Sequence, residues 1–235
     1  MYLDKFEKFL ESVNLEAYRQ KYRPIKIVEM DLPKNIQAIS MLYKVYWDDK
    51  RFIDYEDFYK EYLSQYKKDI ESFREKTTMC KNCFYRGLPA RIYRTWASII
   101  TQIHAGYVAE YVFGDGTVNM SAELDHQGAD FQVKYKGKTL NYQVKKRSFS
   151  REVRQPKKVR NKLEGEFIEI FYEVPNYERI KNPYKRNGKD FYSDYKVFKE
   201  KFLDTGYLKV LKNGFVVFTP QAFIKTKERI DKGLK

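Results

Sequence analysis

Asp130, Gln143 and Lys145 have residue types and a spacing that suit the cleavage of phosphodiester bonds. A carboxylate and an amide oxygen are suitable ligands for Mg2+, a hard ion that keeps several of its waters when a protein binds it. The bound ion can polarise a phosphate and lower the pKa of a coordinated water. A nearby lysine can orient that water and offset the charge that develops on the phosphate. The three residues therefore indicate metal-assisted hydrolysis, with the main-chain carbonyl of Val144 as a further metal ligand.

Hydrophobic alternation around these residues predicts a β-hairpin with a defined register. Residues 130–135 and 139–145 alternate between apolar and polar side chains on either side of Lys136-Gly137, which is a hairpin turn signal. Because successive side chains of a strand point to opposite faces, both apolar sets are buried only if they share one face of the sheet. With a two-residue turn, this condition places Asp130 directly opposite Gln143, with their Cβ atoms about 4.5–5.5 Å apart.

The same register separates the two adjacent lysines of the second strand. Lys145 is expected to project from the face that carries Gln143, whereas Lys146 is in phase with the apolar set. A shift of one residue would bring Lys146 opposite Asp130, but it would also mix polar and apolar side chains on each face. The pattern therefore favours Lys145 as the lysine that acts on the attacking water, with Lys146 as the alternative.

The neutral amide of Gln143 contributes no charge to a metal site, so a further acid is expected nearby. Asp125 and Glu123 precede the first strand of the hairpin, and Glu110 lies near the end of the helix before it. From the residues alone, all three carboxylates are candidates for the compensating acid.

Helices are expected to make up most of the first half of the chain. Apolar residues recur at helical spacing from Phe6 to Val13, from Pro33 through Val45, after a cap at Asp54, and from about Pro89 to Val112. Pro89 is expected in the first turn of the fourth helix, where a proline is well tolerated. Gly114-Asp-Gly should end that helix.

The second half is expected to contain strands as well as helices. After the hairpin, the pattern predicts a strand at Glu166 to Val174, a loop at residues 176–189, a helix around residues 190–203, a hairpin turning at Asn213-Gly214, and a last helix from about Pro220. This order predicts an α+β fold. Residues 1–112 are expected to form a helical part packed on a catalytic β-sheet core of residues 113–235, in one integrated domain.

The basic excess of the chain indicates a polyanionic partner. The 235 residues include 46 Lys and Arg against 32 Asp and Glu, a net charge of +14 that suits nucleic acid. The densest basic run follows the second strand of the hairpin, and its DNA-binding candidates are Lys146, Arg147, Arg151, Arg154, Lys157, Lys158 and Arg160. A second candidate set near the start of the fourth helix is Arg86, Arg91 and Arg94. Such residues contact phosphates or read guanine in the major groove, and the alternative for both sets is a solvated surface.

A membrane location does not fit the sequence. No run approaches the roughly 20 apolar residues that a membrane span needs. The charged N-terminus lacks the apolar stretch of a signal peptide, and no convincing basic amphipathic helix is present. The sequence therefore predicts a cytoplasmic protein with no membrane partner.

Cys80 and Cys83 form a Cys-x-x-Cys pair whose role the sequence leaves open. A structural zinc site needs four ligands, and the chain offers only His104 and His126 besides, at spacings that fit no zinc ribbon or finger. A redox pair would be expected near a βαβ pattern, which is missing. We expect packed free thiols, with His104 as a core residue and His126 as a turn residue.

Several sequence blocks resemble one family of nucleases. They are Tyr22-Arg-Pro-Ile-Lys, Cys80-Lys-Asn-Cys-Phe-Tyr-Arg-Gly-Leu-Pro-Ala-Arg, Tyr93-Arg-Thr-Trp-Ala-Ser-Ile-Ile-Thr-Gln-Ile-His, and Leu124-Asp125 followed by Gly128-Ala-Asp130 and Gln143-Val-Lys-Lys146. The hairpin by itself resembles the PD-(D/E)xK nuclease signature, with Gln143 in the place of an acid. Together the blocks resemble the TaqI family of type II restriction endonucleases, from the N-terminus to about residue 146.

The resemblance implies a magnesium-dependent enzyme that cuts double-stranded DNA at a short palindrome, which is TCGA for the namesake of the family. It also implies a restriction-endonuclease-like PD-(D/E)xK core, a mixed sheet flanked by helices. Two aspartates and a lysine of the family motif fall on Asp125, Asp130 and the Lys145-Lys146 pair, which favours Asp125 over Glu123 as the further acid. A palindromic site implies a homodimer or paired monomers, and the host would need a companion DNA methyltransferase.

Two other functions fit the same residues. A structure-selective or repair nuclease on the same core would nick branched DNA, whereas a restriction enzyme gives discrete fragments from a plasmid. In a non-catalytic nucleic-acid-binding protein, Asp130 would be only a polar residue of the hairpin.

Overall fold

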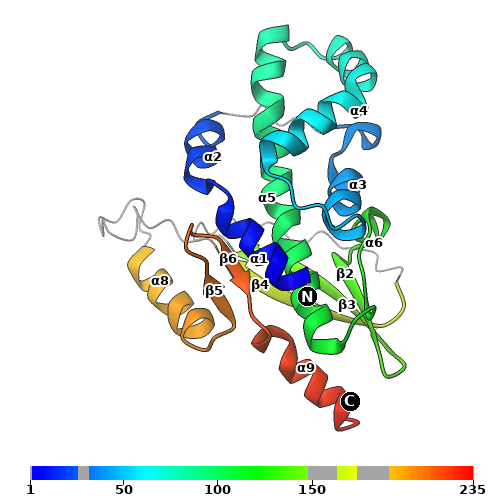
Figure 1. The fold of residues 1–235 in the computed structure, drawn as a ribbon, viewed down its shortest axis with the longest axis vertical. Helices are drawn as coiled ribbons and strands as arrows, with labels where there is room; N and C mark the ends of the chain where they lie inside the picture. The colour runs from blue at the N-terminus through cyan, green and yellow to red at the C-terminus, as the bar shows by residue number, and fades with distance from the viewer. Residues whose placement is uncertain (1, 26–31, 148–162, 174–190, 235) are drawn as a thin grey trace. The chain divides into compact units, whose positions relative to one another are not determined.

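The computed structural model describes residues 2–25, 32–147, 163–173 and 191–234. Within them the chain divides into two compact units, Met1–Ile103 and His104–Lys235, and the long helix α5 (Lys81–Phe113) contributes residues to both. The combination of helices with a mixed sheet confirms the α+β class (Figure 1). None of the helices in the described ranges is both long enough and apolar enough to cross a membrane.

The first unit consists of helices around an aromatic core. Its elements are α1 (Tyr2–Ser12), α2 (Leu15–Tyr22), the 3-10 turn η1 (Lys34–Ile36), α3 (Ile39–Leu42), the π-helical segment η2 (Tyr43–Asp48), α4 (Tyr55–Lys76) and the first part of α5. Trp96 and Tyr46 are fully buried, and the indole Nε1 of Trp96 donates a hydrogen bond of 2.8 Å to the Tyr46 hydroxyl. The polar atoms of these large rings therefore have partners inside the core.

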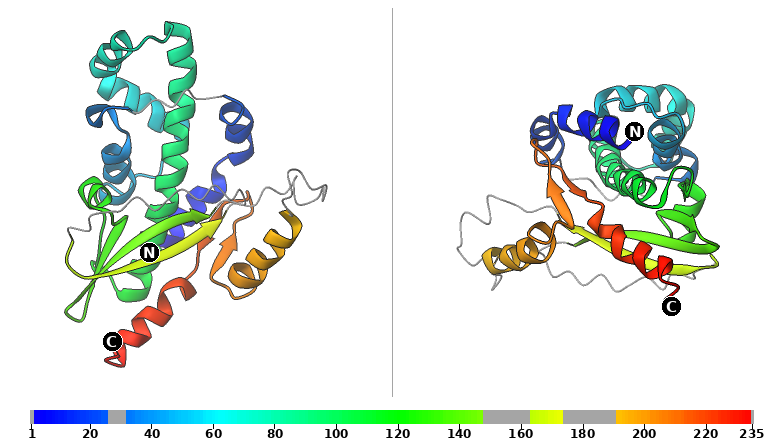
Figure 2. Two further views of the ribbon diagram at one scale, coloured as in Figure 1. Left: turned by 180° about the vertical axis from the view of Figure 1, so that it is seen from behind. Right: turned by 60° about the horizontal axis from the view of Figure 1, so that its bottom comes forward.

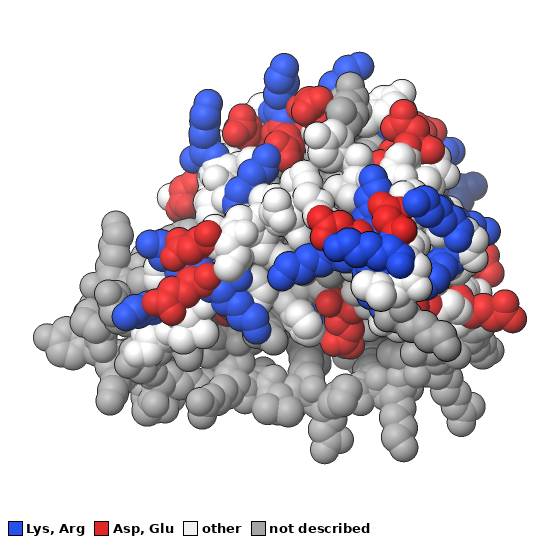
Figure 3. Space-filling model, turned by 90° about the horizontal axis from the view of Figure 1, so that it is seen from below, with Lys and Arg blue, Asp and Glu red and all other residues white. Residues whose placement is uncertain are grey.

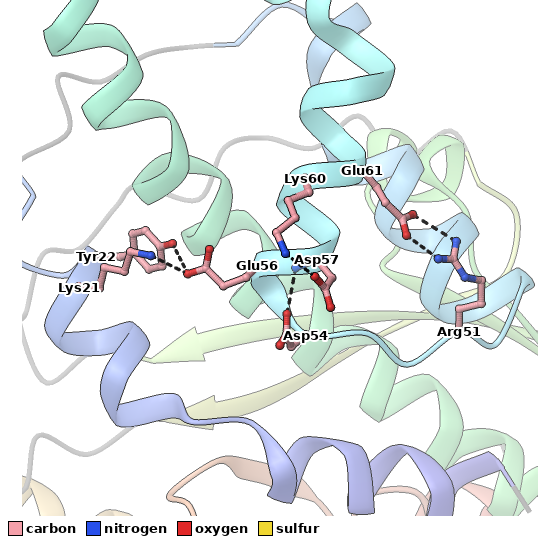
Figure 4. Close-up of polar contacts among 8 residues, drawn as sticks. All are labelled: Lys21, Tyr22, Arg51, Asp54, Glu56, Asp57, Lys60 and Glu61. Atoms are coloured by element: carbon pink, nitrogen blue, oxygen red, sulfur yellow. Dashed lines mark hydrogen bonds and ion pairs between the residues drawn. The ribbon is translucent and has the colours of Figure 1, made fainter.

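Charged residues at the start of α4 fix where this helix begins and what it contacts. The predicted cap is confirmed, because the Asp54 carboxylate accepts a hydrogen bond of 2.9 Å from the main-chain nitrogen of Asp57. Two residues at the end of α2 reach Glu56, with Lys21 Nζ at 2.8 Å and the Tyr22 hydroxyl at 2.7 Å (Figure 4). The sequence block that begins at Tyr22 thus joins two helices of the first unit.

The prediction of one continuous helix from Pro33 through Val45 is wrong. The chain forms η1, α3 and η2 in succession, because the backbone at Gln37 is extended, with φ −70° and ψ 133°. A stretch without helical φ and ψ cannot continue the hydrogen-bond ladder of a helix.

The start of α5 also differs from the prediction. Helix α5 begins at Lys81, so Pro89 lies in its interior and not in its first turn. Phe84 and Leu88 continue the stripe of Ile92 at a spacing of four, and all three side chains are fully buried. Burial of this stripe offsets the hydrogen bond that the proline nitrogen cannot donate. The predicted end is confirmed, since the helix stops at Phe113.

The second unit is built on a four-stranded mixed sheet. Its elements after α5 are β1 (Val118–Asn119), α6 (Ala122–Gln127), β2 (Phe131–Tyr135), β3 (Lys138–Arg147), β4 (Glu166–Glu173), α8 (Phe191–Phe198), the π-helical segment η3 (Lys199–Leu203), β5 (Leu208–Val210), β6 (Val216–Phe218) and α9 (Gln221–Asp231). The strand order is β1-β2-β3-β4, in which β1, β2 and β3 are antiparallel neighbours and β4 runs parallel to β3. Strands β5 and β6 form a separate antiparallel pair.

The hairpin of β2 and β3 has the predicted register. Lys136 and Gly137 form its two-residue turn with φ values of 47° and 74°, as the right-handed twist of a hairpin favours. Phe131 pairs with Tyr142, and both rings are fully buried. Phe223 of α9 packs on this face, with its ring centroid 6.2 Å from that of Phe131 and 5.4 Å from that of Tyr142. Helix α9 is the red helix that lies beside the sheet in the right view of Figure 2. The opposite face of the hairpin is left to polar residues.

The remaining predictions for the second unit also agree with the structure. The strand expected at Glu166 to Val174 is β4, the hairpin at Asn213-Gly214 joins β5 to β6, and α9 follows Pro220. The helix expected around residues 190–203 is present as α8 followed by η3. The loop expected at residues 176–189 lies outside the described residues.

Candidate active site

Asp130 is held against strand β3 by two main-chain contacts. Its nitrogen donates to the carbonyl oxygen of Tyr142 at 2.8 Å, and its Oδ2 accepts from the nitrogen of Val144 at 2.5 Å. The paired register of β2 with β3 ends at Phe131 and Tyr142. One residue before β2, the two bonds hold Asp130 between Tyr142 and Val144, the neighbours of Gln143. Asp130 therefore lies across from Gln143, as the hydrophobic alternation predicts.

The side chain of Gln143 is oriented by the turn that precedes β2. Its Nε2 donates a hydrogen bond to the carbonyl oxygen of Gly128. The amide oxygen is consequently the atom of this side chain that suits a metal ion.

Asp125 reaches the site from α6, a short helix that the sequence prediction missed. Ser121 caps this helix, because its hydroxyl accepts a hydrogen bond of 3.2 Å from the nitrogen of Leu124. Gly128, with φ 99°, ends it. A serine cap followed by a glycine stop is the signal that would have revealed the helix. The side chain of Asp125 is hydrogen-bonded to that of Asp130.

The other two candidate acids have different partners. Glu123 lies on α6 and accepts a hydrogen bond of 3.3 Å from Nε2 of Gln127. Glu110 accepts from the main-chain nitrogen of Gly116 at 3.1 Å, which connects the last turn of α5 to the loop after it. Of the three candidates, Asp125 is the acid whose side chain interacts with that of Asp130 in the described part of the chain.

The contact between Asp125 and Asp130 is electrostatically unfavourable without a cation. Burial raises the pKa of Asp130 to about 8, and the adjacent charge of Asp125 adds to this effect. Burial also raises the pKa of Asp125, although its hydrogen bond to Asp130 acts in the opposite direction. Two adjacent carboxyl groups in this setting share a proton or bind a cation.

The donor atoms around Asp130 fit a hard divalent metal ion. The carboxylates of Asp125 and Asp130 and the amide oxygen of Gln143 are all oxygen ligands, which Mg2+ prefers. No group of three or more His, Cys, Asp or Glu residues that could hold a metal occurs in the parts of the chain that the structure describes. A site of two acids completed by neutral oxygens and waters agrees with that finding.

The two lysines of β3 lie on different faces of the sheet. Lys145 shares the face of Gln143, and its Nζ contacts Oε1 of Glu169 on β4. Lys146 is paired with Tyr172 of β4 and therefore lies on the apolar face. Glu169 is a residue that the sequence reasoning missed, because a strand prediction does not reveal which strand becomes its neighbour.

The long basic run after the hairpin lies mainly outside the described residues. This applies to Arg151, Arg154, Lys157, Lys158 and Arg160, whereas Arg147 ends β3 and the Lys146 side chain is exposed. In the described residues that Figure 3 displays, Lys and Arg side chains lie among Asp and Glu side chains. The candidate DNA-binding role of this run therefore rests on the sequence alone.

The second set of arginines lies on α5 in the first unit. Arg86 and Arg94 are exposed, and Arg91 is half-buried with its Nη1 2.8 Å from the hydroxyl of Thr95. Arg94 donates to the main-chain oxygen of Ile25 at 3.1 Å. Burial and then the neighbouring charge of Arg91 lower the pKa of Arg94.

The expectation of free thiols is wrong. Cys80 and Cys83 form a disulfide directly before and within the first turn of α5, and both residues are exposed. The first turn brings residues three apart to neighbouring positions, so the spacing permits the bond. His104 is fully buried, as expected, but His126 lies on α6 and not in a turn.

Comparison with known proteins shows where this chain belongs. Residues 3–230 match the profile of the TaqI restriction endonuclease family. The chain belongs to this family. It is 34% identical over 236 residues to the type II restriction enzyme TaqI of Thermus aquaticus, with 96% of this chain and 86% of the relative covered. It is 31% identical over 235 residues to a type II restriction enzyme of Thermus thermophilus, with the same coverage.

Membership of the TaqI family makes the chain a restriction endonuclease, which is a site-specific deoxyribonuclease. The family match extends well beyond residue 146, where the recognisable motifs end, and includes β4 and most of α9. No solved structure matches the chain significantly.

Proposed function

We propose that this chain is a magnesium-dependent type II restriction endonuclease that hydrolyses both strands of DNA at a short palindrome. TCGA, the site of the family's namesake, is the first candidate for the palindrome. The observation that carries the proposal is the contact between the Asp125 and Asp130 carboxyl groups, beside the amide of Gln143. Such a pair of acids has no evident structural use, because it destabilises the fold until a cation neutralises it.

In the proposed mechanism, Asp130, Asp125, Gln143 and the carbonyl of Val144 would hold the metal ion. A bound Mg2+ would polarise the phosphate of the DNA and lower the pKa of a coordinated water. Lys145 orients the attacking water and offsets negative charge on the phosphate in the transition state. The hydrogen bond from Val144 to Asp130 keeps the carboxylate against β3, so that it does not have to reorganise when substrate binds.

The arrangement of the sheet supports a PD-(D/E)xK core within the proposed catalytic part, residues 113–235. A hairpin that carries Asp130 and Gln143-x-Lys145 is followed by a parallel strand, β4, and helices accompany the sheet. Residues 1–112 form the helical part of the same proposal. Recognition of a palindrome makes a homodimer on DNA the expected assembly.

The proposed DNA contacts are basic residues of both parts of the chain. They are Lys146, Arg147, Arg151, Arg154, Lys157, Lys158, Arg160, Arg86, Arg91 and Arg94. A cytoplasmic location and a companion methyltransferase that protects host DNA complete the proposal.

Digestion of a plasmid of known sequence tests this function directly. We expect discrete fragments with Mg2+, no cleavage with a chelator, and no cleavage by Asp130→Ala, which should still bind the same DNA without metal. Normal cutting by Asp130→Ala would remove Asp130 from the site. Nicking of branched DNA without discrete plasmid fragments would favour a structure-selective nuclease, and binding without any cleavage would favour a non-catalytic protein.

The same digestion distinguishes the two lysines. Lys145→Ala should reduce the rate more than Lys146→Ala, because only Lys145 shares a face with Gln143. A greater loss for Lys146→Ala would reverse their assignment.

A further inference from the structure

A row of polar side chains crosses three strands of the sheet at the candidate active site. Asp130 lies opposite Gln143 on one side, and Glu169 of β4 is the register partner of Gln143 on the other. Directly paired residues of neighbouring strands point to the same face. Gln143 is therefore flanked by a carboxylate on each side, and Glu169 belongs to the same surface as Asp130.

The ion pair of Lys145 is diagonal across this row. The register partner of Lys145 on β4 is Phe171, yet its Nζ contacts Glu169, which lies opposite Gln143. The lysine side chain consequently leans back along the strand, toward the level of Gln143 and on its β4 side. A lysine paired with a residue further along β4 would carry its ammonium away from that row.

We propose that Glu169 is a positioning residue of the nuclease, which restrains the Lys145 ammonium beside Gln143. This inference rests on the proposed function of that site. A lysine has a flexible four-carbon stem, so its ammonium occupies a defined place only when a partner restrains it. The Lys145 and Glu169 side chains are 42% and 47% exposed, and pairs with that exposure contribute little to stability. The pair is therefore better explained by the position it gives to the lysine than by the stability of the fold.

Direct metal binding by Glu169 is the competing explanation. The described residues include no group of three acidic, histidine or cysteine side chains that could hold a metal, so Glu169 does not form such a group with Asp125 and Asp130. Within the same part of the chain, the side-chain contact of Glu169 is with Lys145. These observations favour a role through the lysine.

A double-mutant cycle under single-turnover conditions tests the inference. Glu169→Gln is expected to cut a cognate duplex roughly 10-fold to 100-fold more slowly, as displacement of a supporting group does. The affinity for DNA and the half-saturating Mg2+ concentration should not change. In a Lys145→Ala background, Glu169→Gln should cause no further loss, because its effect passes through the lysine. Glu169→Asp, which retains the charge, should recover part of the rate.

Glu166→Gln is the matched control for this cycle. Glu166 lies on the same strand and forms an ion pair of 2.6 Å with Arg229. Its register partner is Leu140, so it points to the opposite face of the sheet from Glu169. Its loss should leave the cleavage rate unchanged. Thermal denaturation of every variant verifies that the protein is folded.

Three outcomes would overturn the inference while leaving the proposed function intact. They are a wild-type rate for Glu169→Gln, an additional loss in the Lys145→Ala background, and a raised half-saturating Mg2+ concentration, which would assign Glu169 to the metal. If Lys145→Ala leaves no measurable rate, the metal titration and the Glu169→Asp variant decide. Absence of cleavage by the wild-type protein would instead reject the proposed function, and the inference with it.

Discussion

At the scale of single residues, the central feature is the pair of acids Asp125 and Asp130, which destabilises the folded protein. Asp125 and Asp130 are in contact, and burial raises the pKa of both. A carboxyl group whose pKa is raised in the folded state destabilises the protein at pH values above its ordinary pKa, because it is charged more readily in the unfolded chain. At neutral pH without a cation, the pair should therefore lower the free energy of unfolding.

This cost predicts that Asp130→Asn stabilises the metal-free protein while it abolishes cleavage. The amide removes the like-charge contact but retains an oxygen that accepts from Val144. We expect a gain of roughly 1–2 kcal/mol, or about 2–4 °C in melting temperature for each kcal/mol, in the presence of a chelator. Mg2+ should raise the melting temperature of the wild type but not of the variant.

Glu123→Gln is a suitable control, because Glu123 is an exposed acid on the same helix as Asp125. It should change stability by less than about 0.5 kcal/mol. A lower melting temperature of Asp130→Asn than of the wild type in chelator would contradict the view that the acids are in conflict.

The sequence predicts some residues of this site and misses others, for physical reasons. The position of Asp130 across from Gln143 follows from local hydrophobic alternation. With a two-residue turn, only one register of the two strands puts their apolar side chains on the same face. The position of Asp125 relied on the family resemblance, because α6 is short and has a single buried residue, Leu124. Glu169 was not found, since the pairing of β3 with β4 joins strands separated by residues 148–165 and leaves no local pattern.

At the scale of elements, the alignment of β3 with β4 depends on a close approach at Gly165. This glycine has φ 114°, and a Cβ atom built on it would lie 2.4 Å from the main-chain oxygen of Thr139. Both the left-handed conformation and the contact exclude an ordinary side chain. Gly165 thus lets β4 start beside β3, which brings Glu169 next to Gln143.

Gly165→Ala should therefore destabilise the protein by roughly 3 kcal/mol or more, because backbone of β3 or β4 must move. Gly137→Ala is the matched comparison: Gly137 has φ 74°, but a Cβ there would meet no atom within 4 Å. Its cost should be only about 1–2 kcal/mol. Urea denaturation measures both, and equal midpoints for the two variants would show that the contact with Thr139 can be relieved at little cost.

Element boundaries were predicted best where local chemistry sets them. The cap at Asp54 and the turn at Lys136-Gly137 are formed by a few adjacent residues, and both were found. The start of α5 was misplaced because Pro89 reads locally as a helix start, whereas burial of Phe84 and Leu88 extends the helix before it. Tertiary packing overrides the local preference in that case.

At the scale of the whole molecule, the family match and the charge of +14 describe a protein that acts on DNA. A palindrome presents the same contacts to two identical chains related by a two-fold axis. The described part of the chain carries one candidate site, so we expect two chains to act together when both strands are cut in a single encounter.

We therefore expect two chains per duplex when the protein binds a cognate palindrome, with Ca2+ in place of Mg2+ to prevent turnover. Sedimentation or mass photometry of the complex measures this stoichiometry. A duplex of the same length and a scrambled sequence is the control, and it should bind more weakly and with a steeper dependence on salt. A single chain on the cognate duplex would reject the homodimer and favour sequential nicking.

The topology of the sheet also has a consequence for the order in which the site assembles during folding. Asp130, Gln143 and Lys145 belong to a hairpin with a two-residue turn, which closes a short loop and can form within microseconds. Glu169 arrives only when the parallel strand β4 docks on β3, a pairing between residues more distant in the sequence than those of the hairpin. A nascent hairpin would thus carry Asp130 and Lys145 before the residue that restrains the lysine. On this view the nuclease becomes competent late, when its last sheet strand is in place.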